Sequence, residues 1–213
     1  MDGTGSVHII DDDEAIRDAL STLLEQAGLI PIAHASAASF LEDVGNGDCG
    51  CVITDVRMPG TTGIDLLHRM AEIDRVLPVI IITGHSDVPL AVEALKSGAF
   101  DFIEKPFDGD QIVERVLAAL DMREKARRSE QTRADAASRI AALTHREHDV
   151  LEGLIAGHAN KVIAHNLGIS PRTVEIYRAN VMHKLKVSSL SELVRLTFVA
   201  EGLLHTDAPT TAD

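Results

Sequence analysis

The chain has 213 residues with 45% hydrophobic side chains, which is enough for one large or two ordinary folded domains and excludes a disordered polymer. Its net charge of −13 would argue against nucleic-acid binding, but residues 1–121 hold 22 acidic and 7 basic side chains, whereas residues 122–213 hold 11 acidic and 13 basic. An acidic N-terminus without a leader, and the lack of any apolar run near the ~18 residues of a membrane span, predict a cytoplasmic protein with no membrane contact.

The first 121 residues alternate short β-branched, apolar runs with segments of helical spacing. This alternation is typical of an α/β fold in which helices cover both faces of a parallel sheet. The predicted strands are Val7–Ile10, Leu29–Ala33, Cys51–Thr54, Val79–Thr83 and Asp101–Glu104, and the helices begin near Glu14, Ala37, Gly63, Val88 and Gly109. The sequence therefore predicts a doubly wound, five-stranded domain over residues 1–121.

The fourth predicted helix runs from Val88 to Ser97. Its spacing places Val88, Ala91, Val92 and Leu95 on one face.

Two segments of the second half are predicted to lie outside folded domains. Residues 122–142 are charged, rich in alanine and without a comparable apolar stripe, so we expect an exposed, partly helical linker. Residues 202–213 are polar and are expected to form a disordered tail. Between them, residues 143–201 carry closely spaced helix signals, which predict an all-α domain of four short helices. These signals are the capping boxes Thr144–Glu147 and Ser189–Glu192, the Ser170–Pro171 start and the turn residues Gly157 and Gly168.

Polar side chains follow four of the predicted strands of the first domain. Asp11 and Asp12 come after the first strand, Asp55 after the third, Thr83 after the fourth and Lys105 after the fifth. Because the carboxyl ends of parallel strands meet at one edge of an open sheet, we expect these side chains to share a shallow cleft.

Carboxylates gathered in one cleft repel one another and require a cation, and an oxygen-rich site of this kind suits Mg²⁺. A carboxylate beside Mg²⁺ can act as a nucleophile toward phosphorus, while a lysine adds positive charge and a threonine hydroxyl binds a phosphate oxygen. We therefore predict phosphoryl acceptance on Asp55. Aspartate and threonine are also common helix caps, and for Asp13 the cap interpretation is preferred.

At these positions the chain resembles the receiver domain of two-component response regulators, over residues 5–122. The matching motifs are Ile9–Asp13, Thr54–Gly60, Ile82–His85 and Glu104–Phe107. The resemblance implies a strand order of 2-1-3-4-5, Asp55 as the phosphoacceptor and a cis peptide before Pro106. It also implies that Asp12, Asp55 and the Arg57 carbonyl hold Mg²⁺ with Asp11 assisting, and that Thr83 and Lys105 hold the phosphoryl group.

The resemblance further implies a switch. Thr83 would move toward the phosphoryl group, and Phe102 would change rotamer and repack the surface of the fourth helix and fifth strand. That surface, here Val92, Lys96 and Asp101, would then become a dimer interface. The alternative is that Phe102 is a plain core residue.

Residues Asn160–Leu185 have the pattern helix, turn, helix, with Gly168 at the turn. The second helix carries long polar side chains at positions not needed for packing, and these can reach phosphates and base edges in a DNA major groove. Together with Lys161, the predicted DNA contacts are Arg172, Thr173, Glu175, Tyr177, Arg178, Asn180 and Lys184. A solvated helix surface is the alternative interpretation.

Residues 143–200 resemble the LuxR-type helix-turn-helix of the NarL/FixJ family of response regulators, and the whole chain resembles the FixJ branch most. The matching motifs are Leu143–Glu147, Asn160–Ala164, Ile169–Glu175, Arg178–Leu185 and Ser189–Arg195. The resemblance implies a regulator that a sensor histidine kinase phosphorylates, and that then dimerises, binds double-stranded promoter DNA and works with RNA polymerase. Nitrogen-fixation or microaerobic genes are the implied targets, and no enzyme activity is implied beyond slow Mg²⁺-dependent self-phosphorylation and self-dephosphorylation.

Two other functions remain open from the residues alone. A receiver with a protein-binding output domain would show no salt-dependent affinity for DNA. A phosphatase of the haloacid dehalogenase type would use Asp11 as its nucleophile, because Asp11 to Asp13 also fits the Asp-x-Asp pattern of that family. The phosphatase lacks support elsewhere, since no second acidic pair follows a late strand and the helix-turn-helix would have no role.

Overall fold

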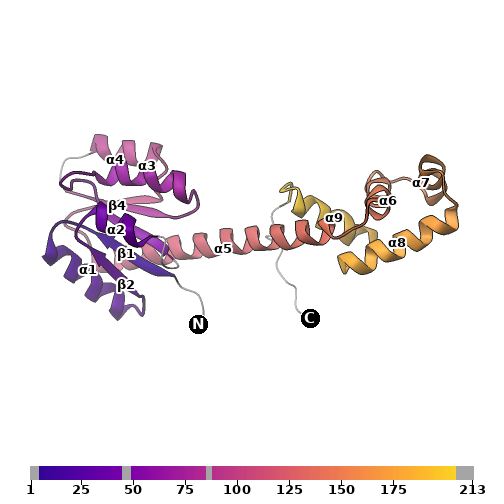
Figure 1. Cartoon of the computed structure of the whole chain (residues 1–213). Helices are drawn as coiled ribbons and strands as arrows, with labels where there is room; N and C mark the ends of the chain where they lie inside the picture. The colour runs from indigo at the N-terminus through magenta and orange to yellow at the C-terminus, as the bar shows by residue number, and fades with distance from the viewer. Residues whose placement is uncertain (1–4, 45–48, 85–87, 205–213) are drawn as a thin grey trace. The chain divides into compact units, whose positions relative to one another are not determined.

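The computed structural model describes residues 5–44, 49–84 and 88–204, and it divides the chain into two compact units, Met1–Ala126 and Arg127–Asp213. Figure 1 shows the ribbon of both units. Each unit has its own hydrophobic core, and each is described by itself.

The first unit contains a parallel sheet in the order β2-β1-β3-β4-β5. Its strands are β1 (Ser6–Ile10), β2 (Pro31–His34), β3 (Cys49–Asp55), β4 (Val79–Thr83) and β5 (Asp101–Glu104). Its helices are α1 (Glu14–Gln26), α2 (Ala37–Asp43), α3 (Gly63–Ile73), α4 (Val88–Lys96) and the first part of α5 (Gly109–Ala141). The predicted doubly wound fold and strand order are confirmed.

Helices cover both faces of this sheet. In Figure 1, α3 and α4 lie above the sheet and α1 lies below it. One apolar cluster joins α2, α3 and α4 to the sheet, and a second joins α1 and α5 to the opposite face. Every residue of β3 and β4 is buried, as expected for central strands of a parallel sheet.

The apolar side chains of α4 that share one helical face are only partly buried. Ala91 and Ala94 are buried, whereas Val92 and Leu95 are each 45% exposed, and the side chain of Val88 lies outside the described residues. Alanines at this position let the helix approach the sheet closely, which leaves the larger side chains on the outer surface. The exposure of Val92 agrees with the surface position that the sequence analysis gave it.

The second unit contains the last part of α5 and four further helices: α6 (His145–Ile155), α7 (Asn160–Leu167), α8 (Pro171–Leu185) and α9 (Leu190–Ala200). Thr144 and Glu147 form the predicted capping box, and Ser170 and Ser189 cap α8 and α9. Gly168 ends α7 in the left-handed region with φ 67°, where glycine avoids the Cβ penalty. Val150, Leu154, Val174, Val181 and Leu193 are among the buried residues that join α6, α8 and α9.

The segment between the two predicted domains is continuous helix, because α5 extends to Ala141. Ala136 is buried, and Ile140 packs against the core of the second unit, so the end of this segment belongs to that core. Most of the predicted tail, residues 205–213, lies outside the described residues. Among the residues that are described, no helix is both long enough and apolar enough to cross a membrane.

Candidate functional site

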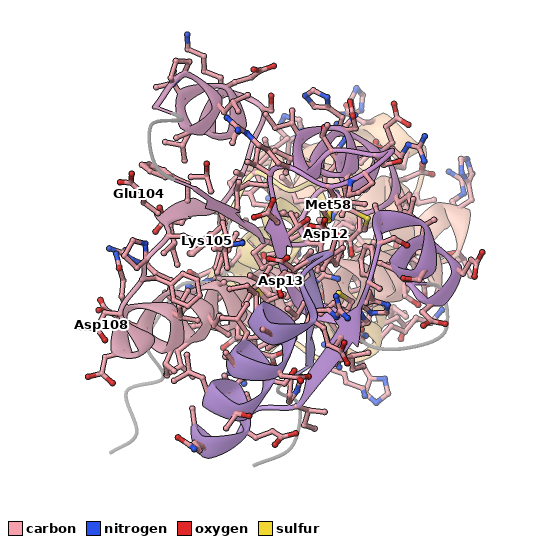
Figure 2. The ribbon with its side chains drawn as sticks, turned by 90° about the vertical axis from the view of Figure 1, so that its left-hand side faces the viewer. Asp12, Asp13, Met58, Glu104, Lys105 and Asp108 are labelled. Carbon is pink, nitrogen blue, oxygen red and sulfur yellow. The ribbon has the colours of Figure 1, made fainter. Side chains whose placement is uncertain are left out.

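The carboxyl ends of β1, β3 and β5 bring two carboxylates and one ammonium group together. Lys105 Nζ donates to Oδ1 of Asp55 over 2.7 Å and to Oδ2 of Asp11 over 2.9 Å. Both carboxylates are buried, and Lys105 is half-buried. Figure 2 shows Lys105 at this edge of the sheet with Asp12 and Asp13. The structure thus joins three of the residues that the sequence placed in one cleft.

Backbone groups fix the remaining oxygens of these two carboxylates. Oδ2 of Asp55 accepts from the amide of Arg57 over 2.6 Å, and Oδ1 of Asp11 accepts from the amide of Asp13 over 2.9 Å. Arg17 also donates to the carbonyl of Asp11 over 2.7 Å. Each carboxylate is therefore held at both oxygens, and the site is oriented before any ligand binds.

Charge is not balanced within this cluster. Burial opposes the charge of Lys105, but the hydrogen bonds to Asp55 and Asp11 and their negative charges outweigh burial and raise the pKa of Lys105. The lysine therefore stays protonated at neutral pH and supplies one positive charge against two carboxylates. A further cation would be attracted to this edge of the sheet.

A glycine brings α3 close to the end of β3. A Cβ at Gly63 would lie 2.3 Å from the carbonyl oxygen of Asp55, a distance that real Cβ atoms do not reach. The amide of Gly63 also donates to the carbonyl of Val56 over 3.1 Å. This close approach closes the short loop that carries Arg57, so the backbone beside Asp55 depends on glycine at position 63.

Three other predicted side chains lie around the cluster. Asp13 caps α1 and accepts from the amide of Ala15 over 2.9 Å, in agreement with the cap interpretation. Asp12 is exposed beside it. Thr83 is buried at the end of β4, where its hydroxyl donates to the carbonyl of Gly84 over 3.4 Å. His85, the last residue of one quoted motif, lies outside the described residues.

Phe102 is 37% exposed, so it is not a plain core residue. It lines a small cavity of about 80 Å³ between α4 and β5, together with Thr83, Val92 and Leu95. Thr83, at the end of β4, and the exposed side chains of Val92 and Leu95 on α4 therefore line the same cavity. Of the other predicted interface residues, Lys96 is exposed and Asp101 pairs with Arg115 over 3.2 Å.

Within the described part of the chain, no three His, Cys, Asp or Glu side chains are arranged to enclose a metal ion. Mg²⁺ does not need such a cage, because it commonly binds through one or two carboxylates and completes its shell with waters. Buried Asp55, exposed Asp12 and the neighbouring carbonyl of Arg57 are hard oxygen donors of the appropriate kind. The residues present therefore fit Mg²⁺ in chemistry.

The outer surface of α8 agrees in part with the predicted contacts. Arg172, Glu175, Asn180 and Lys184 are exposed, whereas Thr173, Tyr177 and Arg178 are half-buried. Tyr177 packs against the core of the second unit. Ile176 was not predicted, yet it is 57% exposed. The sequence did offer a signal for Ile176. It is an apolar residue on a polar helix face, one turn away from Arg172 and from Asn180.

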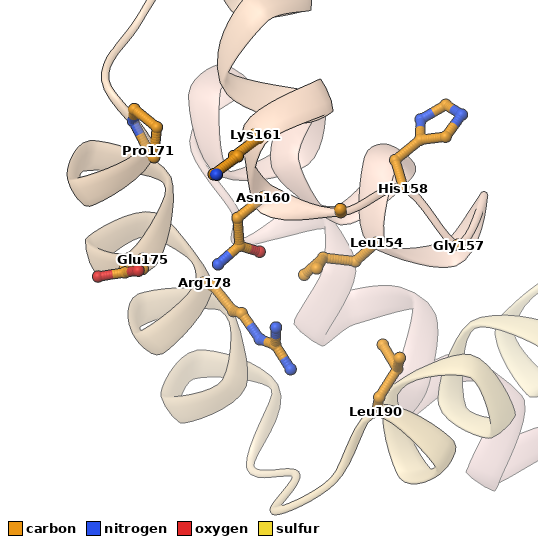
Figure 3. Close-up of a pocket in the computed structure, with 10 residues that line it drawn as sticks. Leu154, Gly157, His158, Asn160, Lys161, Pro171, Glu175, Arg178 and Leu190 are labelled. Carbon is orange, nitrogen blue, oxygen red and sulfur yellow. The ribbon is translucent and has the colours of Figure 1, made fainter.

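A hollow of about 470 Å³ lies beside α8, between the turn after α6 and the start of α7. Figure 3 shows Asn160 and Arg178 directed into this hollow, with Lys161 near its rim. The N-cap of α7, Ala159, makes no side-chain hydrogen bond to the helix. Lys161, Arg178 and the uncapped helix N-terminus contribute positive charge to this hollow, and Glu175, which also lines it, contributes negative charge.

Comparison with known proteins matches both units. Residues 7–117 match the response regulator receiver domain, and residues 141–197 match the bacterial regulatory proteins of the luxR family. The chain is 53% identical to the transcriptional regulatory protein FixJ of Azorhizobium caulinodans over 91% of this chain and 92% of that protein. It belongs to the FixJ-like response regulators.

Solved structures agree with this membership. The response regulator is 50% identical to full-length FixJ from B. japonicum, with a TM-score of 0.59 over 94% of this chain and 98% of that one. It is 37% identical to the response regulator StyR, with a TM-score of 0.83 over 90% and 97% of the two chains. The protein is a transcriptional regulator of a two-component system, with a histidine kinase and DNA as partners. Both family matches favour a receiver with a DNA-binding output domain over the haloacid dehalogenase-type phosphatase and the protein-binding output domain.

Proposed function

We propose that this response regulator accepts a phosphoryl group on Asp55 and, in that form, dimerises through its receiver and binds promoter DNA through α8. The observation that carries the proposal is the bond from Lys105 to Asp55 at the carboxyl end of β3. We assign residues 1–121 to the receiver, 122–142 to the linker and 143–201 to the DNA-binding domain. The protein acts in the cytoplasm.

In the transfer, an oxygen of Asp55 attacks the phosphorus of a phosphohistidine on the kinase. The O–P bond forms as the P–N bond breaks, and the imidazole leaves. Lys105 is already 2.7 Å from Oδ1, so its charge is in place as the phosphoryl group arrives. Thr83 ends the neighbouring strand and offers its hydroxyl to a phosphoryl oxygen.

Asp12, Asp55 and the carbonyl of Arg57 would hold Mg²⁺, with Asp11 assisting. When bound, Mg²⁺ neutralises negative charge on the phosphoryl oxygens. The residues themselves orient the acceptor through the amide of Arg57 and keep Asp11 paired with Lys105. No catalytic role is assigned beyond slow self-phosphorylation from small donors and slow self-dephosphorylation.

The output surface lies on α4 and β5. Thr83 and Phe102 line the same cavity, so movement of Thr83 toward a phosphoryl group would change the space available to Phe102. Val92, Lys96 and Asp101 would form the dimer interface next to it. Dimerisation would present two copies of α8 to two half-sites on promoter DNA, with RNA polymerase as a further partner.

On α8, the exposed side chains Arg172, Glu175 and Asn180 are suited to the major groove. Lys161 and Arg178 line the hollow beside α8, where they could reach a backbone phosphate. Nitrogen-fixation or microaerobic genes are the proposed targets, since the relatives at 50–53% identity carry the name FixJ.

The test is the oligomeric mass of wild type and of Asp55→Asn, measured by analytical ultracentrifugation with Mg²⁺, with and without beryllium fluoride. We expect a shift from monomer to dimer in wild type with both additions, and no shift in Asp55→Asn. An equal shift in the two proteins would refute Asp55 as the acceptor. No shift in either would refute dimerisation as the output.

A further inference from the structure

Two side chains hold the C-terminal end of α8. Lys184 Nζ donates to Oε2 of Glu147 over 2.7 Å, and Arg139 donates to the carbonyl of Leu185 over 3.4 Å. Leu185 is the last residue of α8 and is fully buried. One polar contact from α6 and one from α5 therefore reach Lys184 and Leu185, two consecutive residues at the C-terminal end of the helix that was assigned to the major groove.

The partner of Lys184 is a buried carboxylate. The side chain of Glu147 is 5% exposed, and its Oε2 also accepts from the amide of Thr144 over 2.8 Å and from the hydroxyl of Thr144 over 2.9 Å. The hydrogen bond from Lys184, followed by those from Thr144, holds the pKa of Glu147 below its usual value. Because burying an ionised carboxylate is costly without a paired cation, the ion pair with Glu147 holds Lys184 in place.

Lys184 also lies away from the outward stripe of α8. Residues three or four apart share a face of a helix. Arg172, Ile176, Ala179 and His183 follow this spacing, and all four are exposed. Lys184 follows His183 and is turned by about 100° from it around the helix axis, to the side of α8 that also carries Asn180. Its direction therefore agrees with the bond to α6.

We propose that Lys184 is a positioning residue that fixes α8 against α6 through Glu147 and contacts no DNA phosphate. This inference rests on the proposed binding of DNA by α8. It replaces the expectation, drawn from the sequence, that Lys184 is a DNA contact.

The experiment uses the full chain with Mg²⁺ and beryllium fluoride, and a 30-base-pair duplex that wild type selects from a randomised library. Binding is measured at several salt concentrations for wild type, Lys184→Met, Lys184→Arg, Glu147→Gln and, as a matched control, Arg172→Met. A lost phosphate contact lowers the slope of log affinity against log salt by about 0.9, whereas a mispositioned helix lowers affinity at every salt concentration. Circular dichroism reports the helical content of each variant.

We expect Lys184→Met and Glu147→Gln each to weaken binding roughly tenfold without changing the salt slope, and Lys184→Arg to retain most of the affinity. A slope lowered by about 0.9 in Lys184→Met, or tighter binding by Glu147→Gln, would overturn the proposal. If Lys184→Met does not fold, Glu147→Gln and Lys184→Arg still decide between these outcomes. If the library yields no duplex, or Arg172→Met binds as wild type does, DNA binding by α8 itself is refuted.

Discussion

Lys105 is the cation that the two buried carboxylates of the receiver share. In Lys105→Met, Asp11 and Asp55 would face each other without this ammonium group, and we expect the free energy of unfolding to fall by roughly 1–3 kcal/mol in the absence of metal. Because Mg²⁺ would then relieve a larger repulsion, the stabilisation by Mg²⁺ should be greater in the variant than in wild type. Thermal unfolding with and without about 10 mM Mg²⁺ measures both effects. Equal stabilisation in the two proteins would argue against a cation site at these carboxylates.

A buried histidine pair makes the stability of the receiver depend on pH. His8 Nδ1 and His34 Nε2 are 2.9 Å apart, and both side chains are buried beside Phe40. Burial, followed by the charge of His34, lowers the pKa of His8 to about 4, and burial lowers the pKa of His34 despite Asp43. The folded state therefore binds fewer protons than the unfolded chain, so stability is full above pH 6.5 and is lost as the pH falls toward 4.

We expect wild type to lose roughly 2 kcal/mol of unfolding free energy between pH 7 and pH 5 through His8 alone. His8→Gln keeps hydrogen-bonding groups but does not titrate in this range, so its loss should be smaller. Urea unfolding at the two pH values measures the difference. The same decrease in both proteins would show that the histidine pair does not carry the effect.

The acidic site could be predicted from the sequence because each of its residues follows a strand, and the carboxyl ends of parallel strands lie at one edge of the sheet. The sequence predicted a DNA contact for Lys184, because a lysine on a polar helix face has the same pattern whether it meets phosphate or a carboxylate. Glu147 lies 37 residues away, and its role as a partner follows from packing alone. The exposure of Ile176 is likewise a property of the packed helix.

At the scale of elements, one face of α4 is buried and contributes to stability, whereas the exposed face belongs to the proposed dimer interface. Ala94 is fully buried against the sheet, so Ala94→Leu would overpack this contact and lower the free energy of unfolding by roughly 1–3 kcal/mol. Val92 is exposed, so Val92→Ala should change stability by less than about 0.5 kcal/mol. We expect Val92→Ala instead to weaken the dimer formed with beryllium fluoride. Urea unfolding and ultracentrifugation of both variants test this, and a large stability loss in Val92→Ala would contradict the assigned face.

The strands β4 and β5 and the starts of all five receiver helices were predictable, because turn residues and apolar runs mark them locally. Which apolar residues of α4 are buried could not be predicted in this way, since burial depends on how closely the helix approaches the sheet. The same limit applies to α5. Its charged stretch was expected to be only partly helical, but propensity sustains the helix as far as Ala141, where Ile140 reaches the second core.

At the scale of the whole molecule, the hydrophobic cores of the two units share none of the residues that the structure describes. We therefore expect two transitions in calorimetry. Val181→Ala, in the second core, should lower the midpoint of one transition, and Leu66→Ala, in the first core, should lower that of the other. Each substitution should reduce the free energy of unfolding of its own unit by about 2–4 kcal/mol. A single transition that both variants shift equally would show one cooperative unit.

The carbonyl of Asp55 leaves no space for a Cβ at Gly63, and this restricts which residues the codon can encode. Any other residue at this codon would push α3 away from the strand that ends in the phosphoacceptor. Gly84 has open space around its Cα, so its codon carries no such steric restriction. In a saturation library selected for signalling, codon 63 should therefore return glycine almost alone. The backbone of Asp55 therefore restricts substitution at position 63 on steric grounds alone, independently of selection on the chemistry of the site.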